Sequence, residues 1–134
     1  MKVHGRCHCG AIVYEAEIDP TQVSICHCTD CQILTGTVYR VSVPAKAGDL
    51  HFLEGAPKIY VKTAESGRQR AQGFCGACGT PIYAADTREP SVFNLRTGAL
   101  AERGELKPAR QIWCRSALNW AQDLGGMEMH QKQA

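Results

Sequence analysis

Residues 74–80 read Phe-Cys-Gly-Ala-Cys-Gly-Thr, and this stretch constrains the fold more than any other part of the chain. Two thiolates separated by two residues can reach one tetrahedral zinc ion, at Zn–S distances of about 2.3 Å. Gly76 and Gly79 allow the tight turn that aims backbone N–H groups at sulfur. The stretch therefore predicts one half of a metal site, placed at a turn between two strands.

The chain has 134 residues and 8 cysteines, so six cysteines lie outside this stretch. Two belong to Cys-His-Cys at 7–9, three belong to Cys-His-Cys-Thr-Asp-Cys at 26–31, and Cys114 stands alone. Eight cysteines in a small chain indicate either a disulfide framework or metal sites. The first residues contain no apolar run typical of a signal peptide, so we expect a cytoplasmic protein with reduced thiols. The spacing of the cysteines and the expected reducing compartment together favour metal sites over disulfides.

The most economical grouping of the cysteines gives one closed and one open zinc site. Four thiolates form a closed site, the pattern of structural zinc: Cys7, Cys9, Cys75 and Cys78. Three form a site that keeps a position for water or substrate, the pattern of catalytic zinc: Cys26, Cys28 and Cys31. Closure of the second site by Cys114 or by a histidine remains an alternative at this point.

His8 and His27 each stand between two cysteines. In an extended segment the central residue points away from its neighbours, so we expect both rings to face away from the metal. Imidazole titrates near neutral pH, which suits His27 to carry a proton beside the open site. The predicted catalytic residues are thus Cys26, Cys28, Cys31 and His27.

Short apolar runs rich in β-branched and aromatic residues, separated by turn residues, predict a mainly β protein. We expect strands at 11–17, 23–25, 39–43, 50–53, 58–62, 70–74, 81–84, 92–96 and 111–115, with a hairpin loop at 63–69. Short helical turns are expected after Cys28 and after Trp120. Neither a repeat nor a linker interrupts the chain, so we expect one domain over 1–134, with its core at about 5–120 and a frayed tail over 125–134.

Charge and hydropathy exclude several classes of partner. Lys and Arg number 15 against 13 Asp and Glu, and a net charge of +2 gives no electrostatic argument for nucleic acid or an anionic membrane. No stretch approaches the roughly 18 apolar residues of a membrane span. We therefore expect a small-molecule substrate and neither nucleic acid nor membrane as a partner.

Four motifs occur in a fixed order along the chain. They are Cys-His-Cys-Gly at 7–10, Cys-His-Cys-Thr-Asp-Cys at 26–31 followed by Thr35-Gly36, Phe-Cys-Gly-Ala-Cys-Gly-Thr at 74–80, and Ile112-Trp113 with a later Trp120. Together they resemble the glutathione-dependent formaldehyde-activating enzyme (Gfa-like) family from about Gly5 to Trp120. The resemblance implies a mainly β, Mss4-like (β-tent) fold of stacked antiparallel sheets with zinc-binding loops.

The resemblance also implies an activity and two metal sites. The structural zinc of the family maps onto Cys7, Cys9, Cys75 and Cys78, and its catalytic zinc maps onto Cys26, Cys28 and Cys31. The family reaction forms S-(hydroxymethyl)glutathione from formaldehyde and glutathione, and is classed as a carbon–sulfur lyase in the reverse sense. Zinc is then the expected cofactor, glutathione the expected co-substrate, and a small thiol or aldehyde the expected partner. A homodimer is a further expectation.

Glutathione carries two carboxylates, and basic side chains are needed to bind them. The candidates are Arg40, Arg68, Arg70, Arg96 and Arg115, although each taken singly is expected to be an exposed surface charge. Large aromatic residues are expected to fill the core, namely Tyr39, Trp113 and Trp120. Cys114 is expected to be a small buried residue within a strand.

Two other functions stay open at the level of sequence. One is a non-catalytic, zinc-stapled binding module of the Mss4-like type. The other is a thiol redox or metal sensor, in which the open site loses zinc and its cysteines oxidise. An open position at the second site favours catalysis, whereas closure by a fourth side chain favours a structural role.

Overall fold

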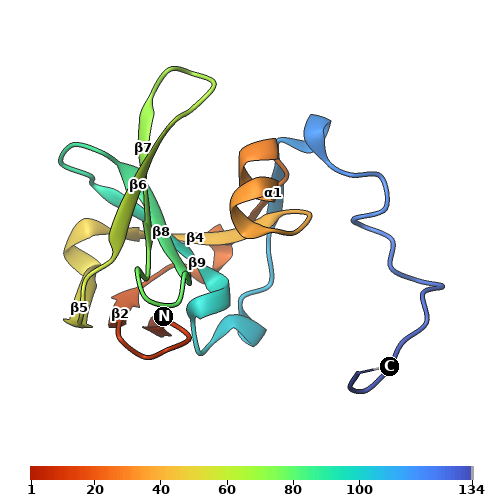
Figure 1. Ribbon diagram of the computed structural model, residues 1–134, viewed down its shortest axis with the longest axis horizontal. Helices are drawn as coiled ribbons and strands as arrows, with labels where there is room; N and C mark the ends of the chain where they lie inside the picture. The colour runs from red at the N-terminus through yellow and green to blue at the C-terminus, as the bar shows by residue number, and fades with distance from the viewer. Residues whose placement is uncertain (134) are drawn as a thin grey trace.

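Two β-sheets stacked on one another make up the body of the protein in the computed structural model, which describes residues 1–133 (Figure 1). The smaller sheet has the order β1-β2-β5. Its strands are β1 (Lys2–Arg6), β2 (Val13–Glu17) and β5 (Leu50–Glu54). Both pairings in this sheet are antiparallel.

The larger sheet has seven strands in the order β10-β3-β4-β9-β8-β7-β6. Its strands are β3 (Ser24–Cys26), β4 (Arg40–Lys46), β6 (Lys58–Thr63), β7 (Gln69–Phe74), β8 (Pro81–Asp86), β9 (Val92–Arg96) and β10 (Arg110–Ile112). All pairings are antiparallel except that of β10 with β3, which is parallel. The predicted mainly β class with stacked sheets is confirmed, with this one parallel pair as the departure.

Short helices occupy the connections. The α-helix α1 (Thr29–Thr35) follows β3, and five 3₁₀ turns complete the set: η1 (Pro20–Gln22), η2 (Ala47–Asp49), η3 (Thr97–Ala99), η4 (Arg103–Glu105) and η5 (Cys114–Ser116). Gly36 ends α1 in the left-handed conformation, at φ 69°. Within residues 1–133, no helix is long and apolar enough to cross a membrane.

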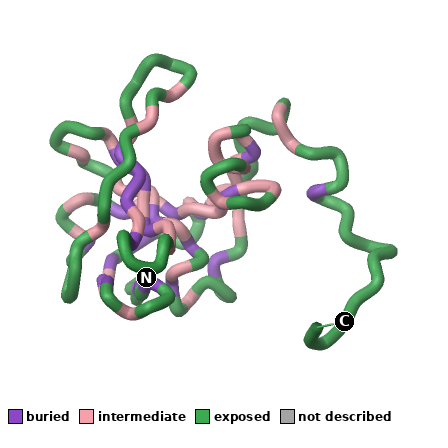
Figure 2. The backbone as a smooth tube through the Cα atoms, in the orientation of Figure 1, coloured by how far each residue is buried: buried purple, intermediate pink, exposed green. Residues whose placement is uncertain are grey.

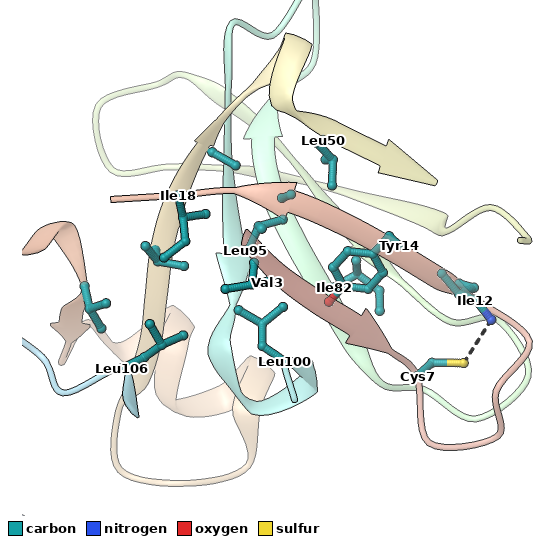
Figure 3. Packing of buried hydrophobic residues seen from close by; sticks show 14 of the residues in the cluster. Val3, Cys7, Ile12, Tyr14, Ile18, Leu50, Ile82, Leu95, Leu100 and Leu106 are labelled. Atoms are coloured by element: carbon teal, nitrogen blue, oxygen red, sulfur yellow. Dashed lines mark hydrogen bonds between the residues drawn. The ribbon is translucent and has the colours of Figure 1, made fainter. Parts of the chain in front are cut away.

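The hydrophobic core lies between the two sheets (Figure 3). Val3 and Tyr14 come from the small sheet, while Val43, Ile82 and Leu95 come from the large one, and all five are buried. Their positions follow the alternation of strand residues, since every second residue of β1 is buried and the buried residues of β2, Tyr14 and Ala16, are two apart. Burial of these side chains holds the sheets face to face.

Two glycines make room for tyrosine rings on neighbouring strands. Gly5 of β1 pairs with Tyr14 of β2, and a Cβ at Gly5 would lie 2.0 Å from Cζ of the Tyr14 ring. Gly73 of β7 pairs with Tyr83 of β8, and a Cβ there would lie 2.6 Å from Cε2 of the ring. Both tyrosines therefore lie flat against the backbone of the opposite strand.

The chain after β10 departs from the prediction. The expected strand at 111–115 is wrong beyond Ile112, because Trp113 adopts a left-handed conformation (φ 57°) and Cys114 begins η5. The core positions expected for Trp113, Trp120 and Cys114 are also wrong, because all three are exposed. Figure 2 shows this C-terminal segment as a largely exposed tube that leads away from the sheets. Residues 125–133 are exposed and contain neither helix nor strand.

Candidate metal centres and their cavity

The closed cysteine cluster forms at two turns, one between β1 and β2 and one between β7 and β8. Cys7 Sγ lies 3.7 Å from Cys9 Sγ, and Cys9 Sγ lies 3.8 Å from Cys75 Sγ. With Cys78, the four sulfur atoms all lie within 4.8 Å of one another. Tetrahedral zinc with Zn–S bonds of about 2.3 Å needs sulfur atoms about 3.8 Å apart. The donor set and its spacing therefore fit zinc.

Hydrogen bonds at both turns favour the thiolate form that binds metal. Ile12 N–H donates to Cys7 Sγ at 3.2 Å, a bond visible in Figure 3. The Thr80 hydroxyl lies 3.1 Å from Cys78 Sγ and, together with backbone hydrogen bonds from Cys9 and Thr80, lowers the pKa of that thiol to about 5. Thr80 also accepts a hydrogen bond from His8 N–H at 3.0 Å, so it joins the two turns directly.

This cluster links the two sheets. Cys7 directly follows β1 of the small sheet, and Cys75 directly follows β7 of the large sheet. Both residues are buried, while Cys9 and Cys78 are exposed. The free energy of metal binding at this cluster would add to the stability of the fold, by on the order of 10 kcal/mol or more for structural zinc.

The open cluster forms where β3 passes into α1. Cys26 is the last residue of β3, Cys28 is the N-cap of α1, and Cys31 lies in the first turn of the helix. Cys28 Sγ accepts a hydrogen bond from Cys31 N–H at 3.2 Å, the role that a serine or aspartate oxygen usually has at an N-cap. The three sulfur atoms lie within 4.8 Å of one another.

No fourth ligand closes this second cluster in the part of the chain that the structure describes. The side chains of this candidate metal-binding group are Cys26, Cys28 and Cys31, without a histidine or a carboxylate. Cys114, the alternative fourth ligand, is an exposed residue outside the group. The structure therefore groups the eight cysteines as the sequence predicted: four in the closed cluster, three in the open cluster, and Cys114 in neither.

The three thiols of the open cluster differ in acidity. A hydrogen bond from Cys26 lowers the pKa of Cys31 to about 5, with further help from Cys28 and from the charges of Arg40 and Arg96. The pKa of Cys26 is raised, because its proton is held by Cys31 and because it is partly desolvated. The cluster thus places its negative charge on the sulfur that lies beside the two guanidinium groups.

His27 lies beneath this cluster rather than in it. The ring is fully buried, its Nε2 lies 2.6 Å from Gln111 Oε1, and its edge meets the Tyr39 ring at a centroid distance of 5.5 Å. The backbone N–H of His27 donates to Ile112 O at 3.1 Å. These contacts hold the Cys26–Cys28 loop against β10. His8, by contrast, is exposed.

A cavity of about 470 Å³ opens beside the three thiols. Five basic side chains line it, namely Arg40, Lys62, Arg68, Arg70 and Arg96, and its described lining contains no carboxylate. A cavity with one sign of charge concentrates ligands of the opposite sign. The cavity therefore fits an anionic ligand next to the open cluster.

Two of these arginines are not the surface charges expected from the sequence. Arg40 is buried, and the buried Nε atoms of Arg40 and Arg96 have no hydrogen-bond partner in the described chain. Arg96 donates to Ser42 Oγ at 2.9 Å and to Gln72 Oε1 at 2.8 Å. Burial, together with the nearby charge of Arg40, lowers the pKa of Arg96 to about 9. A buried cation needs a negative partner, and Cys26 and Cys31 of the open cluster interact with the charges of both arginines.

The other basic residues at the cavity form ion pairs. Arg68 and Arg70 both donate to Asp86 Oδ1, at 2.6 and 2.8 Å. Arg115 pairs with Glu65 at 2.9 Å and stacks over Trp113 at 5.0 Å from the ring centroid. Arg115 lies outside the thiol cavity but lines a neighbouring depression that also contains Cys28 and Trp113.

Residues 2–116 match the family model described as glutathione-dependent formaldehyde-activating enzyme. The chain belongs to this family. A crystal structure of a Rhodobacter sphaeroides protein shares the fold at a TM-score of 0.62 and 22% sequence identity, covering 83% of this chain and 99% of that one. No curated protein matches the chain. The Mss4-like architecture that the motifs implied is confirmed for this family member by the stacked sheets and by this structural neighbour.

Sequence reasoning missed several polar residues of the cavity, among them Ser42, Lys62 and Gln72. The position of Lys62 could have been predicted in part, since the alternation at 58–62 places Lys62 and Tyr60 on the same face of the strand. Ser42 and Gln72 carried none, because their importance comes from the Arg96 side chain that they hold in place.

Proposed function

We propose that this family member is a zinc-dependent carbon–sulfur lyase of the S-(hydroxymethyl)glutathione synthase type, which joins glutathione to a small aldehyde and reverses that reaction. The observation that carries the proposal is the open three-thiol cluster beside a basic cavity of about 470 Å³. Three protein ligands leave a position for a substrate atom. The family match supports glutathione-dependent formaldehyde activation as the class of chemistry.

Cys26, Cys28 and Cys31 would hold the metal. Zinc bound there would supply a low pKa for a substrate thiol and a polarised carbonyl. Lys62, Arg68 and Arg70 offer N–H donors to the carboxylates of glutathione. Arg40 and Arg96 lower the pKa of Cys31 and would offset part of the negative charge that the three cysteines carry when they hold the metal.

The addition is balanced without a further reactant. A carbon–sulfur bond forms between the glutathione sulfur and the carbonyl carbon, and the π electrons of the C=O bond pass to oxygen. The thiol loses one proton and the oxygen gains one, so no net proton is consumed. The reverse reaction breaks the same carbon–sulfur bond, which is the lyase direction.

The predicted proton-carrying role of His27 receives no support from its position. The ring is fully buried, bonds to Gln111 and packs on Tyr39, and it does not line the cavity. We assign His27 as a positioning residue for the Cys26–Cys28 loop, and assign proton exchange to water in the cavity mouth.

Cys28→Ser tests the proposal. Serine is a good N-cap, so α1 keeps its capping bond while the site loses one thiolate. We expect zinc to fall from two to one per chain, the circular dichroism spectrum to remain, and the enzyme-dependent exchange between formaldehyde and its glutathione adduct, measured by NMR, to be lost. Cys114→Ser is the matched control and should keep both zinc ions and the full exchange rate. An unchanged rate in Cys28→Ser would contradict the proposal.

A further inference from the structure

A second cavity adjoins the thiol cavity and differs from it in character. It has a volume of about 410 Å³, and most of its wall is apolar: Tyr60, Phe74, Pro81 and Tyr83. Leu34, Arg40 and Gln72 line both cavities. We call this second cavity the apolar groove.

The fold makes the two cavities continuous along β6. Tyr60 and Lys62 are two residues apart on this strand, so they share a face, with Tyr60 at the apolar groove and Lys62 at the basic cavity. Leu34 of α1 forms the opposite rim. Lys62 also pairs with Asp30 at 2.9 Å, which fixes the strand to the helix across the space between them. In the view of Figure 1, the tip of the β6–β7 hairpin and α1 both lie above β4.

Gly73 and Tyr83 of the groove wall are held in place from the other face of the large sheet. The Tyr83 ring packs over Gly73 on the core face, where it meets the Phe93 ring edge to face at 4.8 Å. Tyr60 and Leu34 remain 54% and 37% exposed at the two rims. Exposed apolar side chains grouped around a depression are a mark of a binding site.

The arrangement sorts the parts of a ligand by polarity. Anionic groups fit the basic end, at Lys62, Arg68 and Arg70. The reacting sulfur and carbon belong beside Cys26, Cys28 and Cys31. Neither the anionic groups nor the reacting atoms of the ligand would occupy the region beyond the shared residues Leu34, Arg40 and Gln72, where the wall becomes apolar. A formaldehyde carbon carries only hydrogen and would leave that region without an occupant.

We infer that the aldehyde of this chain carries an apolar chain or ring on its carbonyl carbon, and that this group lies in the apolar groove. The inference rests on the proposed function, since it names the substrate class of the same site. The chemistry is unchanged: the carbon–sulfur bond forms, the carbonyl oxygen gains the proton that the thiol loses, and the apolar group takes no part.

Binding of two glutathione thioethers to the zinc-loaded protein tests the inference without turnover. S-hexylglutathione carries the apolar group, and S-methylglutathione is identical except for its length. Calorimetry should show the hexyl compound binding at least about ten-fold more tightly, because five additional methylene groups leave water. Equal affinities would overturn the inference while leaving the proposed function intact. Binding of neither compound would overturn both.

Two variants on one strand locate the site. Tyr60→Glu places a charge in the apolar groove, and should bring the affinity for S-hexylglutathione down to that for S-methylglutathione. Ile59→Glu is the matched control, since Ile59 is similarly exposed (44%) but points to the opposite face of β6. It should leave both affinities unchanged. If Tyr60→Glu melts below the control, Leu34→Glu against Ile33→Glu repeats the comparison on α1. Persistence of the hexyl preference in a folded Tyr60→Glu protein would overturn the placement of the group.

Discussion

The ring of Tyr14 occupies the space in which a side chain at Gly5 would lie. The two residues are directly paired across β1 and β2, and Tyr14 is buried at the centre of the core between the sheets. Any residue larger than glycine at position 5 must displace this ring from the core.

We expect Gly5→Ala to destabilise the protein by about 2 kcal/mol or more, because an added methyl group overpacks a filled core. Gly48→Ala is a suitable control, since a Cβ at Gly48 meets no atom within 4 Å. Denaturant unfolding of the zinc-loaded proteins measures both free energies. Equal stability of the two variants would show that β1 can move away from Tyr14 at little cost.

We expect Cys75→Ser to abolish the closed metal site and to prevent stable folding. Cys75 is buried and joins the large sheet to the small one through the cluster with Cys9, at an Sγ–Sγ distance of 3.8 Å. Loss of a structural zinc site removes on the order of 10 kcal/mol, which exceeds the stability of most small domains. Far-ultraviolet circular dichroism and metal analysis are the measurements. A cooperative melt of a Cys75→Ser protein holding one zinc would contradict the structural role.

We expect Arg40→Met to weaken zinc binding at the open site by about ten-fold or more, because a cation close to the thiolates is removed. Chelator competition should show the weakening only for the second zinc equivalent. Arg110→Met serves as the control, because Arg110 is exposed and bonds to Gln22 instead. Tighter zinc binding in Arg40→Met would show that Arg40 repels the metal more than it stabilises its ligands.

The ion pairs of Asp86 predict a dependence of stability on pH. Hydrogen bonds from Arg70 and Arg68 lower the pKa of the Asp86 carboxyl below its ordinary value of 3.8. Such a group stabilises the fold above its unfolded pKa, and this contribution is lost as the pH falls through the lower, folded pKa. Asp86→Asn should therefore melt below the parent at pH 7, with a difference that shrinks below about pH 4. Melting curves at a fixed zinc concentration measure this, and a difference that widens toward acid would contradict it.

Cysteine spacing was enough to predict how the sulfur atoms group, because local geometry holds together the thiols of each motif, one or two residues apart, and the open cluster takes three while the two remaining pairs make four. Most strands were predictable for a similar reason, since β-branched and aromatic runs carry their own signal. Strand β1 was missed because Gly5 weakens that signal, and its place in the sheet depends on Tyr14.

Residues whose environment depends on distant partners could not be predicted in this way. Arg40 is buried at the position where β4 pairs it with Cys26 of β3 and places it beside Cys31, and the residues next to Arg40 in the sequence do not reveal this pairing. Trp113 is exposed because its backbone turns into the left-handed region, which a run of apolar letters does not reveal. The cavity is formed by side chains from several strands and from α1, so the sequence predicted candidate arginines but not which of them line the cavity.

The distance between the two halves of the closed cluster has a consequence for synthesis of the chain. Cys7 and Cys9 are made early, but the sulfur atoms that complete their site belong to Cys75 and Cys78. At about 5–20 residues per second, the first pair is exposed on the ribosome for several seconds before its partners emerge. During that interval the N-terminal hairpin has no fixed attachment to the large sheet, and its two thiols are open to oxidation or to capture by another metal. The closed cluster therefore can form only after both of its turns have been synthesised.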